Sequence, residues 1–331
     1  MGKIAVITPT RDRAGSPGRI GYLEQAIYSV REQKGADYVH VIVDDGSTDR
    51  TADLVGFHRK EDPRIVYIHR DKPPTERQTA SFANNVGIKS VLYSQSYPGQ
   101  DGEMLGAVDY LCLLHSDDLL SEGSLEERAG ILDGDEKTWM VYGSMHNFNN
   151  SEPPLVVREL NVDPTKPLAR IYDDFLARVA PFSNHSVMTR LELLRDIELF
   201  DENVSYGEDR DMSLLMMRKC MENGYDVTGT PNCVYYYRVH DDTVTSWARR
   251  NRVLQKDIAR VTSKHSTYRT PLWVLQTKRF LRKPHAFLPE PIKAPLRKVR
   301  DRVRERKNNI YTTEYLSDLT NRGSEFWEAT A

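Results

Sequence analysis

The stretch VHVIVDDGSTDRTADLVGFHRK, residues 39–60, decides the fold class. It opens with a run of valine and isoleucine typical of a buried strand, turns at the sequence DDGS, and continues with apolar residues at helical spacing. Ser47 or Thr48 is the expected N-cap of that helix. A buried strand that passes directly into a helix is typical of α/β proteins with parallel sheets.

The sequence on both sides repeats this alternation. We expect further strands at residues 3–8, 64–70, 107–115 and 139–148, and helices at residues 21–33, 77–94 and 123–132. The pattern predicts a Rossmann-like, mostly parallel sheet flanked by helices, in which ligands bind beyond the carboxyl ends of the strands. Polar motifs stand at such ends: TPTR at 8–11, DDGS at 44–47 and HSDD at 115–118.

The later part of the chain is less regular. A helix is expected over residues 208–224 and a strand over 233–239, and near residue 250 the sequence turns basic and rich in proline. The chain has 331 residues, 39% of them apolar, and no apolar run reaches the length of a membrane span. Three scattered cysteines form no metal or disulfide pattern, so a reducing cytoplasm is the expected compartment.

The acidic motifs of the first half each allow a structural and a chemical interpretation. Asp117 and Asp118 either cap a following helix or hold a hard divalent cation at a strand end. Asp44 and Asp45 either belong to a turn or accept hydrogen bonds from a base and a ribose.

Two further positions allow the same pair of interpretations. Glu208 and Asp209 open the expected helix, where the helix dipole favours acids and where a carboxylate can also act as a general base. His240 follows a strand and is either a structural histidine or a third metal ligand beside carboxylates. Each of these signals is weak alone, so their order along the chain carries more information.

In that order, six segments together resemble the family 2 glycosyltransferases of the GT-A fold. They are VITPTRDR, VIVDDGSTDRTADL, FANNVGI, LHSDDLL, FDENVSYGEDRDMSLLM and YYRVHDDTVTS, and the resemblance spans residues 3–246. It implies a GT-A catalytic domain over residues 1–250, with a nucleotide-binding half at 1–120 and an acceptor half at 121–250. A mainly helical, basic C-terminal extension is expected at 251–331.

The resemblance implies a base and a metal site. Asp209, with Glu208 beside it, corresponds to the catalytic base of the family. The family's metal-binding motif normally begins with an aspartate, and His115 stands in that place here. The residues that correspond to ligands of Mn²⁺ or Mg²⁺ are Asp117, Asp118 and His240.

The resemblance also implies contacts with the two substrates. Asn184 and His185 lie where the family builds its acceptor or donor-sugar wall. The residues that correspond to nucleotide contacts are Thr8, Pro9, Thr10, Arg11, Asp44, Asp45, Arg77, His115, Ser116 and Asp117.

The implied reaction is a single displacement with inversion, in which a sugar moves from a nucleoside-diphosphate sugar to an acceptor hydroxyl. A UDP-sugar is the expected donor, because it is the commonest in the family. A carbohydrate, a lipid-linked molecule or a protein would be the acceptor, in the assembly of surface polysaccharides or glycoconjugates. Two alternatives stay open: a sugar nucleotidyltransferase, whose glycine-rich loop would come earlier after the first strand, and an inactive glycosyltransferase-like binding protein, supported only by His115.

Residues 278–307 form a strongly basic segment, with twelve lysines or arginines against three acids. A narrow apolar stripe runs along it, formed by Ile292, Leu296, Val299 and Val303. The segment either docks on an anionic membrane, which would place the protein at the inner face of that membrane, or packs on the acidic remainder of the chain or on another subunit. Nucleic acid is the least favoured partner, because residues 291–309 place no aromatic side chains among the basic ones.

Overall fold

The structure, a computed structural model, describes residues 1–16, 19–71, 79–93, 107–149, 151, 154–177, 182–240, 253–269 and 314–330. Arg77 and the basic segment 278–307 lie outside the described residues. Within the described part of the chain, no helix combines the length and the apolar composition needed to cross a bilayer.

Strands and helices alternate through the first half of the chain, as expected. The strands there are β1 (Ile4–Thr10), β2 (Gly15–Ser16), β3 (Arg19–Ile20), β4 (Tyr38–Asp44), β5 (Ile65–His69), β6 (Tyr110–Leu113) and β7 (Leu119–Leu120). The helices there are α1 (Tyr22–Arg31), α2 (Thr51–Glu61), α3 (Ser81–Leu92) and α4 (Ser124–Gly134). The second half holds β8 (Thr138–Phe148), β9 (Val156–Leu160), α5 (Leu168–Leu176), the 3₁₀ turn η1 (Asn184–Ser186), β10 (Val187–Arg190), α6 (Leu191–Arg195), α7 (Glu208–Asn223) and β11 (Asp226–Arg238). Beyond these come α9 (Leu254–Arg269), α12 (Glu314–Asn321) and α13 (Glu325–Thr330).

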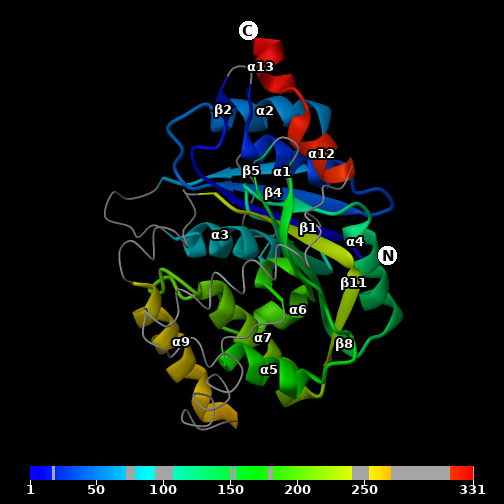
Figure 1. Ribbon diagram of the computed structural model, residues 1–331, viewed down its shortest axis with the longest axis vertical. Helices are drawn as coiled ribbons and strands as arrows, with labels where there is room; N and C mark the ends of the chain where they lie inside the picture. The colour runs from blue at the N-terminus through cyan, green and yellow to red at the C-terminus, as the bar shows by residue number, and fades with distance from the viewer. Residues whose placement is uncertain are drawn as a thin grey trace, which may run out of the picture.

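One large sheet forms the centre of the molecule (Figure 1), in the order β5-β4-β1-β6-β10-β8-β11-β7, with β9 paired to β8. The first four of these strands run parallel, and so do β8 and β11. The expected parallel sheet is therefore found in the N-terminal half, whereas the other half is mixed, because β10, β7 and β9 pair antiparallel. The connection from β8 to β9, residues 149–155, is too short for the crossover that a parallel pair needs.

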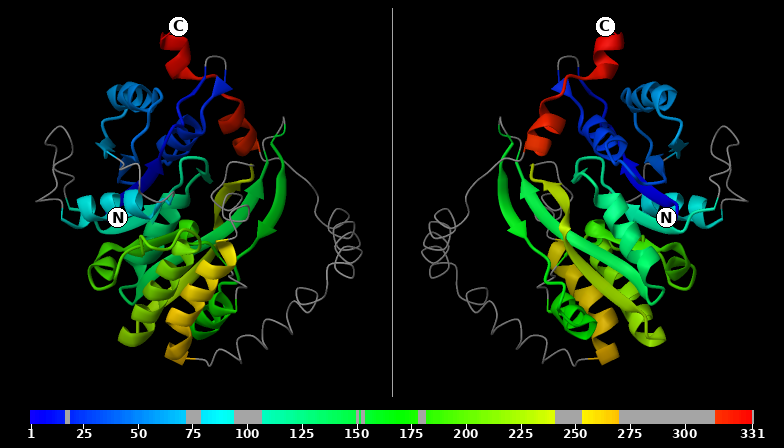
Figure 2. Two further views of the ribbon diagram at one scale, coloured as in Figure 1. Left: turned by 90° about the vertical axis from the view of Figure 1, so that its left-hand side faces the viewer. Right: turned by 90° about the vertical axis from the view of Figure 1, so that its right-hand side faces the viewer.

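Helices cover both faces of the sheet, and the alternation of residues along β1 shows how. Ala5 and Ile7 pack with α3 and α7 in one apolar cluster, whereas Ile4 and Val6 pack with α1 and α4 in a second cluster. Figures 1 and 2 show α12 and α13 (red) at one end of the molecule beside α1 and α2 (blue), and α9 (gold) at the other end beside α5 and α7.

The docking of α13 covers a buried carboxylate–imidazole pair. The Glu24 carboxylate of α1 accepts a hydrogen bond from the Ser324 hydroxyl at 2.6 Å and pairs with His58 Nε2 at 3.1 Å. Burial alone would raise the pKa of Glu24, but the hydrogen bonds from His58 and Ser324 outweigh it and hold that pKa below its ordinary value. The indole N–H of Trp327 donates to the backbone oxygen of Ala14 at 3.2 Å, so this end of the chain also supports the loop after β1.

One expectation about helix caps is wrong, and one of the two interpretations left open for Asp117 and Asp118 is excluded. The N-cap residue of α2 is Arg50, without a side-chain cap, because the Ser47 hydroxyl donates to Asp44 at 2.6 Å instead. The Asp117–Asp118 pair caps no helix either, since β7 follows it directly and α4 begins only after Gly123. A structural cap therefore does not explain these two acids.

Candidate functional site

The strand register brings the polar motifs to one edge of the sheet. In the parallel pairs, Thr10 lies opposite Asp44, Asp44 lies opposite His69, and Ile7 lies opposite Leu113, two residues before His115. The carboxyl ends of β5, β4, β1 and β6 therefore form a continuous row.

The turn after β4 builds the loop that follows β1. The backbone N–H of Asp12 donates to Ser47 Oγ at 2.9 Å, and the Asp12 carboxylate accepts the N–H of Thr48 at 2.7 Å. The Asp49 carboxylate accepts the N–H of Ala14 at 3.0 Å. Asp12 has a φ of +51°, a backbone conformation that is uncommon outside glycine and often found at ligand-binding loops. Residues 11–14 are thus held by the DDGSTD sequence.

Both acids of the DDGS motif have protein partners. One oxygen of the buried Asp44 accepts the N–H and the hydroxyl of Ser47, and the other accepts the hydroxyl of Tyr67. Asp45 forms an ion pair with Arg70, just beyond β5. Asp44 therefore shapes the turn, and a nucleotide contact by Asp45 would share its carboxylate with Arg70.

The four residues of the TPTR motif occupy different environments. The Thr8 hydroxyl is buried and bonded to His40 Nε2 at 2.8 Å, so it faces the interior of the domain. The Thr10 hydroxyl is buried at the strand end and has no hydrogen-bond partner among the described residues. Pro9 is buried, and Arg11 is exposed. Of the two threonines, Thr10 is the one whose hydroxyl is left for a ligand.

Strand β7 pairs with β11 and brings the end of β11 beside the HSDD motif. Leu119, directly after the motif, pairs with Tyr236. The hydroxyl of Tyr235 then donates to one oxygen of the buried Asp118 at 2.6 Å, and the N–H of Arg238 donates to the other at 2.8 Å. Burial and the charge of Asp117 raise the pKa of Asp118 well above its ordinary value.

Asp117 has different partners from Asp118, a histidine and an arginine. Its carboxylate oxygen lies 3.0 Å from His240 Nε2 and 3.5 Å from Arg13 Nη2. Burial would raise the pKa of Asp117, but the hydrogen bond with His240 and the charge of Arg13 outweigh it and hold that pKa well below its usual range. The sequence motifs singled out Arg11 and missed Arg13, because only the turn at Asp12 shows which arginine reaches the carboxylate.

His115, the departure from the family motif, is one of a pair of histidines whose rings are in contact and tilted by 53° to each other. Its ring lies 3.9 Å from the ring of His185 in η1, measured between centroids. Burial lowers the pKa of His115 to about 3 and that of His185 to about 4, so both rings are neutral at neutral pH. His115 Nε2 is buried and unpartnered among the described residues.

The residues present fit a divalent cation. His115, Asp117 and Asp118 each offer a ligand atom, and these atoms lie within 4.8 Å of one another. His240 reaches the same carboxylate of Asp117 from the other side. A donor set of carboxylates and imidazoles suits Mn²⁺ better than Mg²⁺, which prefers oxygen ligands.

The acids of α7 approach this cluster through His115. Gly207, with a φ of +84°, ends the preceding loop, and Glu208 and Asp209 form the first turn of the helix. Burial raises the pKa of Asp209, while burial and the charge of Asp209 raise the pKa of Glu208 to about 8. The negative charge of Asp209 opposes the lowering of the pKa of His115.

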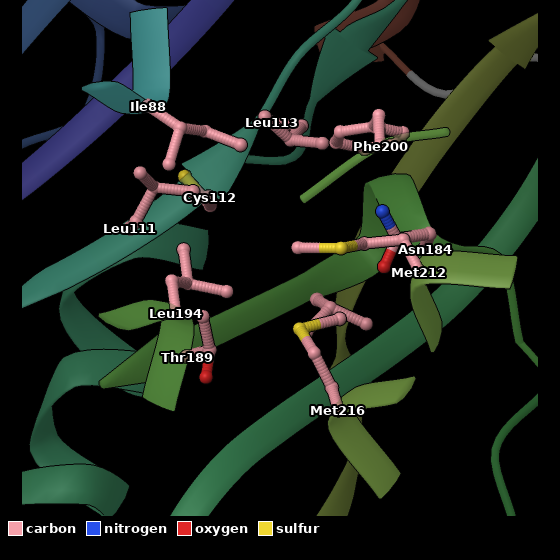
Figure 3. A pocket seen from close by; sticks show the side chains of 11 residues that line it. Ile88, Leu111, Cys112, Leu113, Asn184, Thr189, Leu194, Phe200, Met212 and Met216 are labelled. Atoms are coloured by element: carbon pink, nitrogen blue, oxygen red, sulfur yellow. The ribbon is translucent and has the colours of Figure 1, made fainter. Parts of the chain in front are cut away.

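Asn184, expected at the acceptor or sugar wall, is buried. Its Oδ1 lies 3.1 Å from the Ser213 hydroxyl of α7. Figure 3 shows it at the edge of a small cavity between apolar side chains such as Leu111, Phe200 and Met212. This cavity lies between the sheet and α7. Of the two residues expected to contact the acceptor, His185 is the one whose ring contacts His115, a member of the cluster formed by His115, Asp117 and Asp118.

Comparisons with known proteins agree with this architecture. Residues 5–75, which include β1 to β5, match the model of the family described as glycosyl transferase family 2. An uncharacterized glycosyltransferase from Rickettsia conorii is 25% identical over 224 residues, 68% of this chain and 32% of its own length. Another from Rickettsia bellii is 25% identical over 207 residues, 62% of this chain and 25% of its own. The chain thus spans about a third or less of the length of these curated relatives.

Solved structures share the fold. One is S. aureus TarS 1–349 in complex with UDP, with a TM-score of 0.56 and 18% identity, covering 86% of this chain and 72% of that one. Another is the mannosyltransferase PcManGT from Pyrobaculum calidifontis in complex with GDP-Man and Mn²⁺, with a TM-score of 0.54 and 15% identity, covering 99% and 85%. The expected GT-A fold and the resemblance to the family 2 glycosyltransferases are confirmed.

Proposed function

We propose that this chain is a metal-dependent, inverting glycosyltransferase that moves a sugar from a nucleoside-diphosphate sugar, first of all a UDP-sugar, to an acceptor hydroxyl. The observation that carries the proposal is one convergence at the sheet edge. The Asp117 carboxylate lies 3.0 Å from His240 Nε2 and close to His115, and the negative charge of Asp209, at the start of α7, acts on the same His115 ring. The UDP held by TarS and the GDP-Man held by the mannosyltransferase support a nucleoside-diphosphate donor.

The nucleotide would bind along the ends of β1 and β4. The Thr10 hydroxyl is buried there and unpartnered within the described residues, and Asp45 stands on the neighbouring strand end. Arg13, 3.5 Å from the Asp117 carboxylate, is a cation that could contact the diphosphate beside the metal ligands. An arginine is suited to this place because its planar donors match phosphate oxygens.

A divalent cation bound by Asp117, together with His115, Asp118 and His240, would offset the charge that develops on the departing nucleoside diphosphate. The chain's own contribution is to hold these ligands in place. Tyr235 and the backbone of Arg238 fix Asp118, and Arg13 keeps Asp117 charged.

Asp209 would accept the proton of the attacking hydroxyl. Its raised pKa makes it a stronger base than an exposed aspartate once it is deprotonated. Burial and the charge of Asp209 raise the pKa of Glu208 to about 8, so Glu208 is the acid of the pair that would hold a proton at neutral pH. His185 is the remaining candidate for the acceptor or sugar wall, and the acceptor itself would belong to surface polysaccharide or glycoconjugate assembly.

The test combines binding and turnover. UDP, GDP, dTDP and their sugars are screened by thermal shift with Mn²⁺, and donors that bind are then assayed for sugar release before and after EDTA treatment. We expect a nucleotide-specific rise in melting temperature, and sugar release that stops with EDTA and returns with Mn²⁺. Pyrophosphate release from a nucleoside triphosphate and a sugar phosphate would indicate a nucleotidyltransferase instead. Binding without any turnover would indicate an inactive binding protein, and activity that survives EDTA would rule out the metal.

A further inference from the structure

We propose that Asp257 on α9 is a positioning residue that fixes the loop before α7 and thereby the carboxylate of Asp209. The proposal rests on the proposed function, in which Asp209 is the base. It also changes the expected boundary between the catalytic domain and the C-terminal extension, which the sequence pattern places at residue 250. In this proposal α9 belongs to the catalytic domain.

The first observation is a pair of hydrogen bonds to the loop backbone. Asp257 is buried, and one of its carboxylate oxygens accepts the N–H of Ser205 at 2.9 Å and the N–H of Tyr206 at 3.1 Å. Hydrogen bonds to an ionised carboxylate are about twice as strong as those between neutral groups. Asp209 follows Tyr206 by only three positions, across the left-handed Gly207. A shift of the loop would therefore move the base.

The second observation lies just after Asp209 in the sequence. Asp211 of α7 is buried and binds two side chains of α9: His265 Nε2 at 2.6 Å and Lys264 Nζ at 2.9 Å. Hence α9 contacts the chain on both sides of Asp209. Its Asp257 carboxylate binds the loop before α7, and its Lys264 and His265 bind the Asp211 carboxylate within α7.

The third observation shows what else holds this segment. Arg210 donates from Nε to the backbone oxygen of Phe175 at 2.9 Å and from Nη2 to that of Leu176 at 2.9 Å, at the end of α5. The N-cap Gly207 offers no side chain to the first turn of α7. Without Asp257, two backbone N–H groups of a buried loop would lose their acceptor, and the loop would have to move to regain one.

The chain offers a matched control on the same helix and the same loop. Arg260 of α9 donates to the Asp201 carboxylate at 3.2 Å and to the backbone oxygen of Asn203 at 3.4 Å. It is half exposed, and its partners lie farther from Asp209 along the chain. Arg260→Gln therefore loosens α9 without freeing the N–H groups of residues 205 and 206.

The experiment uses the full chain with Asp257→Ala, Asp257→Asn and Arg260→Gln. Hydrogen exchange of the amides over residues 203–211 is measured, together with kcat for sugar release and the Kd of UDP with Mn²⁺. For Asp257→Ala we expect faster exchange at residues 205–209 and a kcat about 10²-fold lower, since a shift of about 1 Å has that effect, with an unchanged Kd. Asp257→Asn keeps one acceptor oxygen without its charge, so both its exchange and its kcat should lie between those of the wild type and Asp257→Ala.

Two results would overturn the proposal: unchanged exchange and kcat in Asp257→Ala, or equal losses in Arg260→Gln, which would reduce the effect to general loosening of α9. If Asp257→Ala does not fold, unchanged exchange and kcat in the milder Asp257→Asn overturn the proposal in the same way. A failure of the proposed function looks different. The wild type would then release no sugar, while the exchange at residues 205–209 would still respond to Asp257→Ala.

Discussion

Replacing Asp209 by asparagine separates the proposed chemistry from the structure around it. The Asp209 carboxylate accepts the backbone N–H of Arg210 at 2.7 Å, and an amide oxygen can accept the same bond. The nucleotide contacts come from other strand ends, so binding should survive. What is lost is the group that takes the proton, an effect typically of about 10²–10⁴-fold. This corresponds to about 3–5 kcal/mol in the barrier. We therefore expect kcat to fall by at least 100-fold, about the lower end of that range.

The assay is sugar transfer or release measured against pH, with the Kd of UDP measured in parallel. Burial raises the pKa of Asp209, and only the deprotonated form can accept a proton. The wild-type rate should therefore be lost as the pH falls through a value above that of an ordinary aspartate, and Asp209→Asn should show no such limb. Near-normal turnover in Asp209→Asn, or a loss of UDP affinity as large as the loss of rate, would refute the assignment.

Three further predictions address the supporting residues. Arg13→Gln should weaken the binding of UDP, but not of uridine, in calorimetric titrations with Mn²⁺. Lys60→Gln, which removes an exposed charge on α2, should change neither affinity. Equal UDP affinities of the wild type and Arg13→Gln would contradict the assignment. Tyr235→Phe removes a buried donor to Asp118, so the free energy of unfolding should fall by about 1–3 kcal/mol in denaturant titrations; an unchanged value would argue against the bond. Because folding lowers the pKa of Glu24, its charge stabilises the fold above the unfolded pKa near 4.5, and this contribution is lost as the pH falls through the folded value. The difference in melting temperature between the wild type and Glu24→Gln should thus be largest at neutral pH and shrink in acid, and a constant difference would count against it.

Much of the fold could be predicted because its signals are local. The run of valine and isoleucine before DDGS gives β4, and the apolar spacing after it gives α2. The order of motifs also grouped Asp117 with His240 across the sequence, and their side chains lie 3.0 Å apart, although the metal role of both stays a prediction.

The misses have tertiary causes. Ser47 does not cap α2, because the Asp44 carboxylate competes for its hydroxyl. Asn184 is buried, because η1 packs against β6, β8 and α7, and its contact with an acceptor stays a prediction. The sequence does not distinguish the two neighbouring aspartates, yet the Asp118 carboxylate accepts a hydrogen bond from Tyr235, whereas the Asp117 carboxylate contacts His240. No spacing rule distinguishes them, since the difference arises from the pairing of β7 with β11.

The contact between Glu24 and Ser324 joins positions 300 residues apart, and it has a consequence for the order of assembly. During synthesis from the N-terminus, β1 can pair with β4 early. The contacts of Ser324 with Glu24 and of Trp327 with Ala14 can form only after residues 324–327 have been translated. We expect chains that stop before residue 324 to leave the Glu24–His58 pair exposed to solvent and to be cleaved preferentially by proteases near α1 and α2. The N-terminal half would then be synthesised first but complete its packing last.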